Sequence, residues 1–445
     1  MKKRLLDWIV CPQCGERPRL QVFREERVEI PSLVSAPACS FYCGRHDLAQ
    51  PERITPPPDC NSCYQEEILE GALSCASCGL VYPIVGGIPR LIRNASEEYA
   101  DFFARHNLAP SLSPHPLTPS PVTGRGEKKE AGWGRPSPGD GRGDGGEGPT
   151  SDRRSFKSFS QQWTIYQEGD HTWFKDDAGL RKQEFLDNLD VAAEELPGKT
   201  MLDGGCGNGE LTRSIAEYDL EIVAMDFSRS VEKARERLFS KGFPVSHKVH
   251  YIQGNVLELP LLPRSFDLVH TSGVLHHTPS TYRAFRSISK APKPGGKLYV
   301  QLYRRRPTWI HLVNVSLRAV TTRLPMGLLY GLCYAATPLH SALSRLVHFL
   351  RREPAPPKAT ARERAVQMFD NYSPKFQYRH TVPEIVDLFR SEGYENVKDV
   401  TLDNEARHML AVLGTSPSLP SHSTRAGEGG QVEAEKVGNI GSVPA

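Results

Sequence analysis

The chain has 445 residues, which at roughly 100–200 residues per domain suggests two or three domains. Hydrophobic residues make up 38% of it, enough for at least one substantial core, and the net charge is only +3. This near-neutral balance argues against a dedicated nucleic-acid binder whose affinity comes from a strong positive field.

The N-terminus, MKKRLLDWIVCPQC, begins as a secretory signal does but does not continue as one. Its apolar run is short, carries Asp7 and leads directly into a cysteine pair. No uncharged apolar run reaches about 18 residues, so no transmembrane helix is predicted. We therefore expect a cytoplasmic protein whose cysteines are thiols or metal ligands rather than disulfides.

Eight of the ten cysteines lie within the first 78 residues, as four close pairs. The first and last pairs, CPQCG and CASCG, have two intervening residues and a following glycine, the arrangement of a zinc knuckle. Two knuckles complete a four-thiolate site, which is structural because it leaves no open position for a substrate. The predicted zinc ligands are Cys11, Cys14, Cys75 and Cys78.

The other two pairs lie between these knuckles, at Cys39, Cys43, Cys60 and Cys63. The simplest interpretation is an insert that holds a second zinc ion on these four sulfurs, so the chain would bind one or two ions. Cross-braced pairing with the outer knuckles and four unbound thiols are the alternatives. The spacing alone leaves all three open.

The segment after the last knuckle, LVYPIVGGIPRLI at 80–92, predicts a short strand, a Gly-Gly turn and an apolar strand. Together with the early CPxC and the late CxxCG, it resembles the small zinc-ribbon proteins that act as activating partners or N-terminal modules of methyltransferases. The resemblance covers residues 5–93 and implies a zinc-ribbon module over 1–95. The cysteine-bearing insert departs from the compact form of that family.

Residues 109–150 hold 10 Gly and 8 Pro and very few apolar side chains, so they cannot bury enough surface to offset the entropy of ordering. We predict a linker over 96–154 that is disordered from about residue 109. A tail of the same character is predicted to be disordered over 416–445.

Between linker and tail, short apolar runs alternate with amphipathic stretches, the pattern of an α/β sheet covered by helices. Seven strands are predicted, at 199–203, 221–226, 249–253, 266–271, 297–302, 395–401 and 408–413. Helices are predicted near 178–190, 209–217, 228–241, 279–290 and 381–393. The close final pair of strands suggests an antiparallel edge on an otherwise parallel sheet.

A glycine-rich turn, MLDGGCGNGEL at 201–211, follows the first of these strands. Its spacing fits neither the dinucleotide fingerprint nor the phosphate-binding loop. It resembles the S-adenosylmethionine loop of class I methyltransferases, where glycines let a ligand lie directly on the backbone. Asp226, at the end of the second strand, is placed to accept both ribose hydroxyls of a nucleoside cofactor.

Three further segments carry the same resemblance in the same order: YIQGNVLELP (251–260), FDLVHTSGVLHHT (266–278) and PKPGGKLYV (292–300). The first is similar to the segment that contacts the adenine, with Asn255 in place of the usual Asp. The resemblance is to type 11 methyltransferases of the ubiquinone/menaquinone kind, and it implies a seven-stranded Rossmann-like sheet over a domain at 155–415. It assigns S-adenosylmethionine binding to Asp203, Gly205, Gly207, Gly209, Asp226, Asn255, Val256 and Ser272.

Two segments flank this predicted site. FSQQWTIY at 159–166 resembles the segment that caps the cofactor in this family, and ordinary helix packing is its alternative. Residues 307–352 predict two or three apolar helices with arginines around them, a helical lid inserted into the domain. The lid is either buried against the sheet or covers an apolar substrate while touching a membrane surface.

Methyl transfer is an in-line displacement, so a base is needed only when the acceptor must lose a proton. His276 and His277, in the loop after the fourth predicted strand, are both placed to act as a catalytic base, and His277 is the first candidate. His380 and Tyr372 are further candidates, and a structural hydrogen-bonding role is the alternative for each.

The leading hypothesis is a methyltransferase that uses S-adenosylmethionine and acts on a small-molecule or lipid-linked metabolite. An rRNA or tRNA base methyltransferase with an N-terminal zinc module is the second, disfavoured by the near-neutral charge and by the lack of a basic, aromatic stripe. A non-catalytic scaffold is the third, disfavoured by the intact glycine loop. The acceptor and any protein partner of the ribbon stay open.

Overall fold

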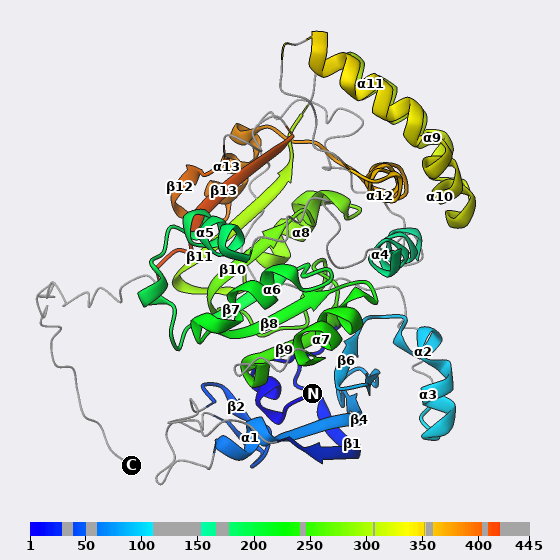
Figure 1. Ribbon diagram of the computed structural model, residues 1–445. Helices are drawn as coiled ribbons and strands as arrows, with labels where there is room; N and C mark the ends of the chain where they lie inside the picture. Colours follow the sequence, from blue (N-terminus) through cyan, green and yellow to red (C-terminus); the bar gives the residue numbers. More distant parts are fainter. Residues whose placement is uncertain are drawn as a thin grey trace, which may run out of the picture.

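The computed structural model describes residues 1–28, 39–49, 60–109, 153–165, 178–240, 246–305, 308–350, 352, 359–402 and 408–418. These residues form one eleven-stranded sheet covered by helices, together with a separate two-stranded ribbon (Figure 1). The disorder predicted from about residue 109 and in the tail falls almost entirely outside the described residues.

Seven strands match those predicted from the sequence. They are β7 (Thr200–Gly204), β8 (Glu221–Asp226), β9 (Val249–Gly254), β10 (Phe266–Ser272), β11 (Pro292–Tyr303), β12 (Glu395–Asp399) and β13 (Met409–Thr415). Their order in the sheet is β9-β8-β7-β10-β11-β13-β12. The first five are parallel, and β13 runs antiparallel to both β11 and β12. The predicted Rossmann-like sheet with an antiparallel edge is confirmed.

Helices cover both faces of this part of the sheet, as the alternation of apolar residues requires. One face carries α5 (Ala178–Leu189), α6 (Glu210–Ile215) and α7 (Ser230–Ser240), and the other carries α8 (Thr281–Ile288) and α13 (Val382–Ser391). In β8, Ile222 and Ala224 pack beneath α5 to α7, whereas Val223 and Met225 belong to the core beneath α8 and α13. Both faces of this part of the sheet are therefore buried under helices.

The remaining four strands come from the N-terminal module. They are β1 (Arg19–Arg27), β4 (Glu66–Ser74), β5 (Val81–Val85) and β6 (Ile88–Leu91), each antiparallel to the next. β6 then pairs in parallel with β9, with Arg90 opposite Gln253 and Leu91 opposite Gly254. The backbone groups along the edge of β9 gain partners in this way. The seven predicted strands are thus part of a longer sheet, and the ribbon module lies against the chain's own second domain.

A buried network of charges joins the two parts. Arg4, in the short helix η1 (Lys3–Asp7), donates to both carboxylate oxygens of Glu221 at 2.9 Å. Tyr64 donates to the same carboxylate at 2.7 Å, and a ring nitrogen of His250 lies 3.2 Å from it. Trp8 stacks on Phe266, with ring centroids 6.1 Å apart. Charges buried this deeply are tolerated only when paired, so separating the two parts would leave Glu221 without its guanidinium partner.

Residues at the start of the predicted linker are packed structure instead. They form α2 (Ala95–Glu98) and α3 (Ala100–Arg105), because Tyr99, Phe102 and Phe103 bury their rings in a small apolar cluster. Phe227, the residue after Asp226, packs against the same cluster. The end of the N-terminal module therefore supports a loop that follows β8.

The lid insertion consists of α9 (Thr308–Thr321), α10 (Met326–Ala335) and α11 (Thr337–Leu350), at the periphery of the molecule (Figure 1). Leu329 and Cys333 of α10 pack against Phe369 of α12 (Ala361–Tyr372). The Arg318 guanidinium donates to the carbonyl oxygens of Asn371 and Pro374 at 2.5 and 2.6 Å. The insertion rests on α12, which corrects the expectation of a lid buried against the sheet. Within the described ranges, no helix combines the length and apolarity needed to cross a membrane.

Candidate functional site

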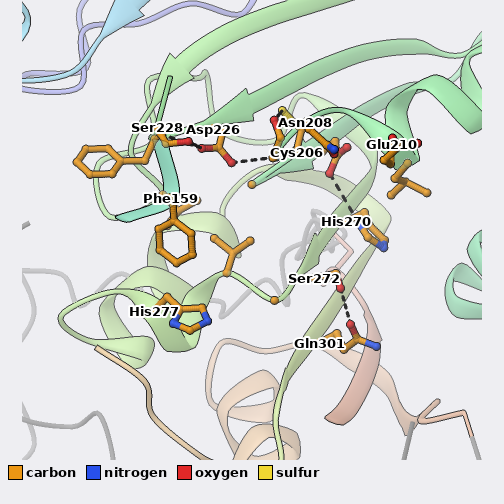
Figure 2. A pocket seen from close by; sticks show the side chains of 18 of the residues that line it. Phe159, Cys206, Asn208, Glu210, Asp226, Ser228, His270, Ser272, His277 and Gln301 are labelled. Carbon is orange, nitrogen blue, oxygen red and sulfur yellow. Dashed lines mark hydrogen bonds and ion pairs between the residues drawn. The ribbon is translucent and has the colours of Figure 1, made fainter. Parts of the chain in front are cut away.

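A cavity of about 330 Å³ lies at the carboxyl ends of β7, β8, β10 and β11 (Figure 2). The loops that follow parallel strands meet at this edge, where open α/β sheets bind ligands. Seven of the eight predicted cofactor residues line the cavity: Asp203, Gly205, Gly207, Asp226, Asn255, Val256 and Ser272. The eighth, Gly209, lies just behind them as the residue before α6.

The glycine loop leaves no room for side chains. Gly205 and Gly207 have φ angles of +97° and +55°, which other residues rarely adopt. A Cβ at Gly205 would lie 2.1 Å from Val274, and one at Gly207 would lie 2.7 Å from Trp163. Trp163 belongs to α4 (Arg153–Ile165), which carries most of the predicted capping segment and lines the cavity together with Phe159. The cavity therefore has a bare backbone floor under an aromatic side chain.

Asp226 is held in place by backbone and hydroxyl donors. Its Oδ2 accepts the Gly207 N–H at 2.9 Å, and its Oδ1 accepts the N–H and the hydroxyl of Ser228 at 2.8 and 2.7 Å (Figure 2). Burial raises the pKa of Asp226, and these hydrogen bonds only partly counter the increase. A buried carboxylate of this kind gains from further hydroxyl donors.

Asp203 and His270 form a polar wall next to the glycine loop. The Thr212 hydroxyl donates to Asp203 Oδ2 at 2.7 Å, and His270 Nδ1 lies 3.8 Å from Asp203 Oδ1. The His270 ring stacks on Tyr299, with centroids 4.8 Å apart. Since a carboxylate oxygen accepts more than one hydrogen bond, Asp203 retains capacity for a donor on a ligand.

The other two polar side chains predicted to bind the cofactor already have partners. Asn255 Oδ1 accepts the Leu257 N–H at 3.0 Å, so this side chain also holds its own turn. The Ser272 hydroxyl donates to Gln301 Oε1 (Figure 2). Asn255 can still donate from its amide group to a ligand, because only its oxygen is used in the turn.

Among the four candidate bases, His277 is the one that lines the cavity. Its Nδ1 lies 2.9 Å from the carbonyl oxygen of Phe376. A carbonyl oxygen only accepts, so Nδ1 carries the proton and Nε2 keeps its lone pair. Phe159 stands edge-on to the ring, with centroids 5.2 Å apart (Figure 2). Burial lowers the pKa of His277 to about 3, which keeps the ring neutral and makes it a weak base.

The structure gives the other three candidates packing positions. His276 is fully buried, and its ring contacts the rings of both His277 and Tyr303, which also contact each other. His380 Nε2 lies 3.1 Å from the hydroxyl of Thr281. Tyr372 ends α12, and its carbonyl oxygen accepts a hydrogen bond from the lid. None of the three is among the described residues that line the cavity.

Asp370, which the sequence analysis did not single out, also lines the cavity. It occupies the last turn of α12 and is buried. Burial raises its pKa to about 6, although hydrogen bonds from Gln162 and Tyr303 and the charge of Arg318 act in the opposite direction. The sequence around residue 370 has an amphipathic pattern, but it does not indicate that this helix borders the cavity.

The four outer cysteines meet at one point in the N-terminal module. Their sulfur atoms all lie within 4.8 Å of one another. The two knuckles have the same form, since Gly15 N–H donates to the Cys11 carbonyl at 2.8 Å and Gly79 N–H to the Cys75 carbonyl at 2.9 Å. Both glycines have positive φ angles, 79° and 71°. These donors fit a closed, tetrahedral zinc ion.

The inner cysteines lie in two small elements beside this module. Cys39 and Cys43 border the hairpin of β2 (Tyr42–Cys43) and β3 (Leu48–Ala49), and Cys60 and Cys63 lie at the start of α1 (Asn61–Gln65). Within the described residues, their sulfurs do not form a group as close as the outer four. Burial is the main reason that the pKa of Cys63 rises to about 12, and the charges of Cys43 and Cys60 add to the increase. A second zinc ion stays a prediction.

Two family models match this chain. Residues 202–300 match the methyltransferase domain family, and residues 2–87 match the Trm112p-like protein family. Over residues 202–300 the chain is therefore similar to methyltransferase domains. The resemblance that the sequence analysis drew is confirmed for both parts of the chain.

The curated relatives are similar to the methyltransferase domain. The ubiquinone biosynthesis O-methyltransferase of Xanthomonas euvesicatoria pv. vesicatoria is 32% identical over 134 residues, which cover 30% of this chain and 55% of the relative. That of Proteus mirabilis is 30% identical over 144 residues, which cover 32% and 57%. The chain thus spans little more than half the length of these relatives.

Among solved structures, phosphoethanolamine N-methyltransferase 2 of Haemonchus contortus in complex with S-adenosyl-L-methionine is 14% identical, with a TM-score of 0.36. The match covers 60% of this chain and 58% of that one. The matched family range of the methyltransferase domain ends at residue 300, before the lid and Asp370. Asp370 and the lid therefore belong to the part of the chain that this family model leaves out.

Proposed function

We propose that this protein transfers a methyl group from S-adenosylmethionine to a small-molecule or lipid-linked acceptor. The observation that carries the proposal is a single cavity with a bare glycine loop and the buried Asp226 on one side, and His277 and Asp370 on the other. Bound S-adenosylmethionine supplies a methyl group already activated on a sulfonium. Holding the acceptor in line with that methyl group is then sufficient for much of the rate enhancement.

The cofactor assignments follow from the contacts in the cavity. Asp226 accepts the ribose hydroxyls, because its buried carboxylate has acceptor capacity beyond the donors of Gly207 and Ser228. The loop at Gly205 and Gly207 allows the ligand to approach the backbone. Asp203 pairs with the amino group, and the amide of Asn255 donates to the adenine edge.

On the acceptor side, the two candidate groups have different roles. Asp370, whose pKa of about 6 lies close to neutral pH, is the better proton acceptor. His277, whose pKa is about 3, remains neutral and presents Nε2 as a hydrogen-bond acceptor that orients the substrate. The predicted catalytic role of His277 is therefore proposed as contact with the acceptor, with the proton passing to Asp370.

The acceptor that we propose is neutral or cationic and partly apolar. A buried carboxylate disfavours an anionic group at the reacting end, and the apolar lid lies one helix away. We also propose that the enzyme works in the cytoplasm next to a membrane, where a lipid-linked acceptor would be found, and that residues 307–352 make the contact.

The test is to incubate the protein with radiolabelled S-adenosylmethionine and separated lipid, small-molecule, RNA and protein fractions of its host. The proposal expects label in the lipid or small-molecule fraction, and much less with Asp226→Ala. Label in RNA would instead favour the second hypothesis from the sequence. Cofactor binding without labelling of any fraction would point to the scaffold.

A further inference from the structure

Exposed apolar side chains are concentrated on the lid insertion. Among the described residues, fifteen large apolar side chains are exposed, and all but Val22 and Leu180 lie on α9 to α11. The most exposed are Phe349 at 79% and Leu339 at 75%. Scattered exposed apolar residues are ordinary, but thirteen on three consecutive helices mark an interaction surface.

These side chains follow the helical repeat. In α11, Leu339, Leu343, Leu346 and Leu350 are spaced by four, three and four residues, so they form one stripe. In α9, Val313, Leu317 and Val320 have the spacing of four and three. We call these two stripes, with Leu328 and Leu332 of α10, the outer face.

The opposite side of the insertion is already occupied. Leu329 and Cys333 are buried against α12, and Arg318 is buried where it binds the end of α12. The folded core therefore uses the inner side, and no described segment packs over the outer face. Figure 1 shows α9 and α11 along the rim of the molecule, away from the sheet.

The charges around the outer face have one sign. From Arg304 to Arg352 the sequence contains no Asp or Glu, and Arg323, Arg345 and Arg352 are exposed. A second copy docked through the same face would bring arginines against arginines in a two-fold arrangement. An anionic lipid surface complements both properties, because it offers negative headgroups above an apolar interior.

We propose that the outer face docks on an anionic bilayer, with α9 and α11 lying in the plane of the membrane. The stripes enter the boundary between headgroups and acyl chains, and the arginines meet the headgroup phosphates. This specifies the membrane contact within the proposed function, and it holds whether or not methyl transfer is found.

Docking in this orientation connects the membrane to the cavity. The inner side of the insertion rests on α12, and Asp370 in the last turn of α12 lines the cavity. The lid helices and α12 are then the two layers that separate the bilayer from the acceptor side. An acceptor with an apolar tail would need to leave the lipid by only that distance.

The experiment is vesicle co-sedimentation with the full chain. Vesicles of phosphatidylcholine alone are compared with vesicles that also contain phosphatidylglycerol. The test variant is Leu339→Glu/Leu343→Glu/Leu346→Glu, and the matched control is Val22→Glu/Leu180→Glu, which changes the two exposed apolar residues elsewhere. We expect the wild type and the control to partition onto the anionic vesicles, and the triple variant to lose at least tenfold in partitioning.

The charge contribution is tested with Arg323→Gln/Arg345→Gln, which should weaken partitioning most at low salt. Calorimetric binding of S-adenosylmethionine by each variant shows that the fold is intact, and its absence in the wild type would count against the proposed function alone. Equal partitioning of the triple variant and the wild type, or no partitioning of either, would overturn the proposal. The proposal would also be overturned if sedimentation without vesicles showed that the wild type is a dimer and the triple variant a monomer.

Discussion

Asp226 combines two tasks at the residue scale, since it fixes the Gly207 backbone and faces the cavity. We expect Asp226→Ala to weaken the binding of S-adenosylmethionine by roughly 1.5–3 kcal/mol, the usual loss for charge-assisted hydrogen bonds. Asp226→Asn should lose less, because its amide oxygen can still accept from Gly207. Isothermal calorimetry on the three proteins checks this, and an unchanged affinity in the alanine variant would refute the assignment.

The effect of replacing Asp370 on the free energy of unfolding should depend on pH. Its pKa rises from 3.8 to about 6 in the folded protein, so the ionised form is disfavoured there. The contribution of the protonated carboxyl to stability is complete below pH 4 and is lost as the pH rises through 6. At pH 7.5, Asp370→Asn should therefore raise the free energy of unfolding by about 1–3 kcal/mol, and by much less at pH 4.

The same variant should lose activity. If the acceptor gives up a proton, Asp370→Asn is expected to slow methyl transfer by about 10²–10⁴-fold, the usual contribution of a general base. Asp387→Asn, at an exposed position on α13, is the control for both measurements. Urea unfolding at two pH values and a rate profile against pH provide the data. Full activity of Asp370→Asn would show that Asp370 is not the general base, and catalysis would then come from positioning of the acceptor.

The site residues that the sequence predicted share one property. Gly205, Gly207 and Asp226 come from motifs in which neighbours along the chain determine the geometry, so the local pattern was sufficient. Asp370 reaches the same cavity from more than 140 residues further on, through the packing of α12. No local pattern reports such packing, and the basicity of Asp370 is a result of burial.

At the scale of elements, the contact between η1 and β8 is the most testable. Burial alone would raise the pKa of Glu221, but Arg4 and His250 outweigh it and hold that pKa well below its usual range. The stability from this pairing is present above the unfolded-state pKa and is lost as the pH falls toward the folded-state value. Arg4→Met should thus destabilise the protein by about 3–5 kcal/mol at neutral pH, because a buried charge is left unpaired.

The control for that variant is Arg24→Met, which removes an exposed partner of Glu70. Surface pairs of this kind contribute about 0–1 kcal/mol. The double variant Arg4→Met/Glu221→Leu should recover much of the loss. If Arg4→Met and Arg24→Met unfold at the same denaturant concentration, the buried pair does not stabilise the interface.

The zinc ribbon leads to a prediction about metal content. The outer cysteines should bind one zinc ion per chain, and the inner four would raise the count to two. Cys75→Ser should remove the first ion, and Cys43→Ser/Cys63→Ser the second. Elemental analysis of the purified full chain distinguishes these outcomes. A wild type with a single ion that is retained in Cys43→Ser/Cys63→Ser would restrict zinc to the outer site, and no ion in the wild type would contradict the ribbon.

Strands and helices of the methyltransferase domain were predictable because their apolar periodicity lies within each segment. The pairing of β6 with β9 was not, since it joins residues about 160 positions apart by backbone hydrogen bonds that any side chain permits. The placement of the lid was missed for a related reason. Its helices are apolar on both sides, so the sequence could not tell the side that packs on α12 from the outer face.

For the whole molecule, the sequence predicts that the ribbon is a separate module, so that a fragment of 155–415 would fold and bind cofactor without it. In the structure that fragment lacks β6, Arg4 and Trp8, and it exposes Glu221 and His250. We expect it to unfold at a lower temperature than the full chain and to bind cofactor only weakly. Thermal scans and calorimetry of both proteins test this, and equal stability would show that the ribbon is only an appendage.

The continuous sheet also determines which strands face solvent at its two ends. One end is β1, whose nine residues include three arginines and two glutamates, and the other is the charged strand β12. Charged edges resist pairing with other chains. β9 has the sequence VHYIQG, without Asp, Glu, Lys or Arg. If β6 separated from it, β9 would become an exposed, uncharged edge strand that could pair with other chains. The ribbon thus protects a polypeptide that would otherwise aggregate, and loss of zinc should appear first as turbidity rather than as lost activity.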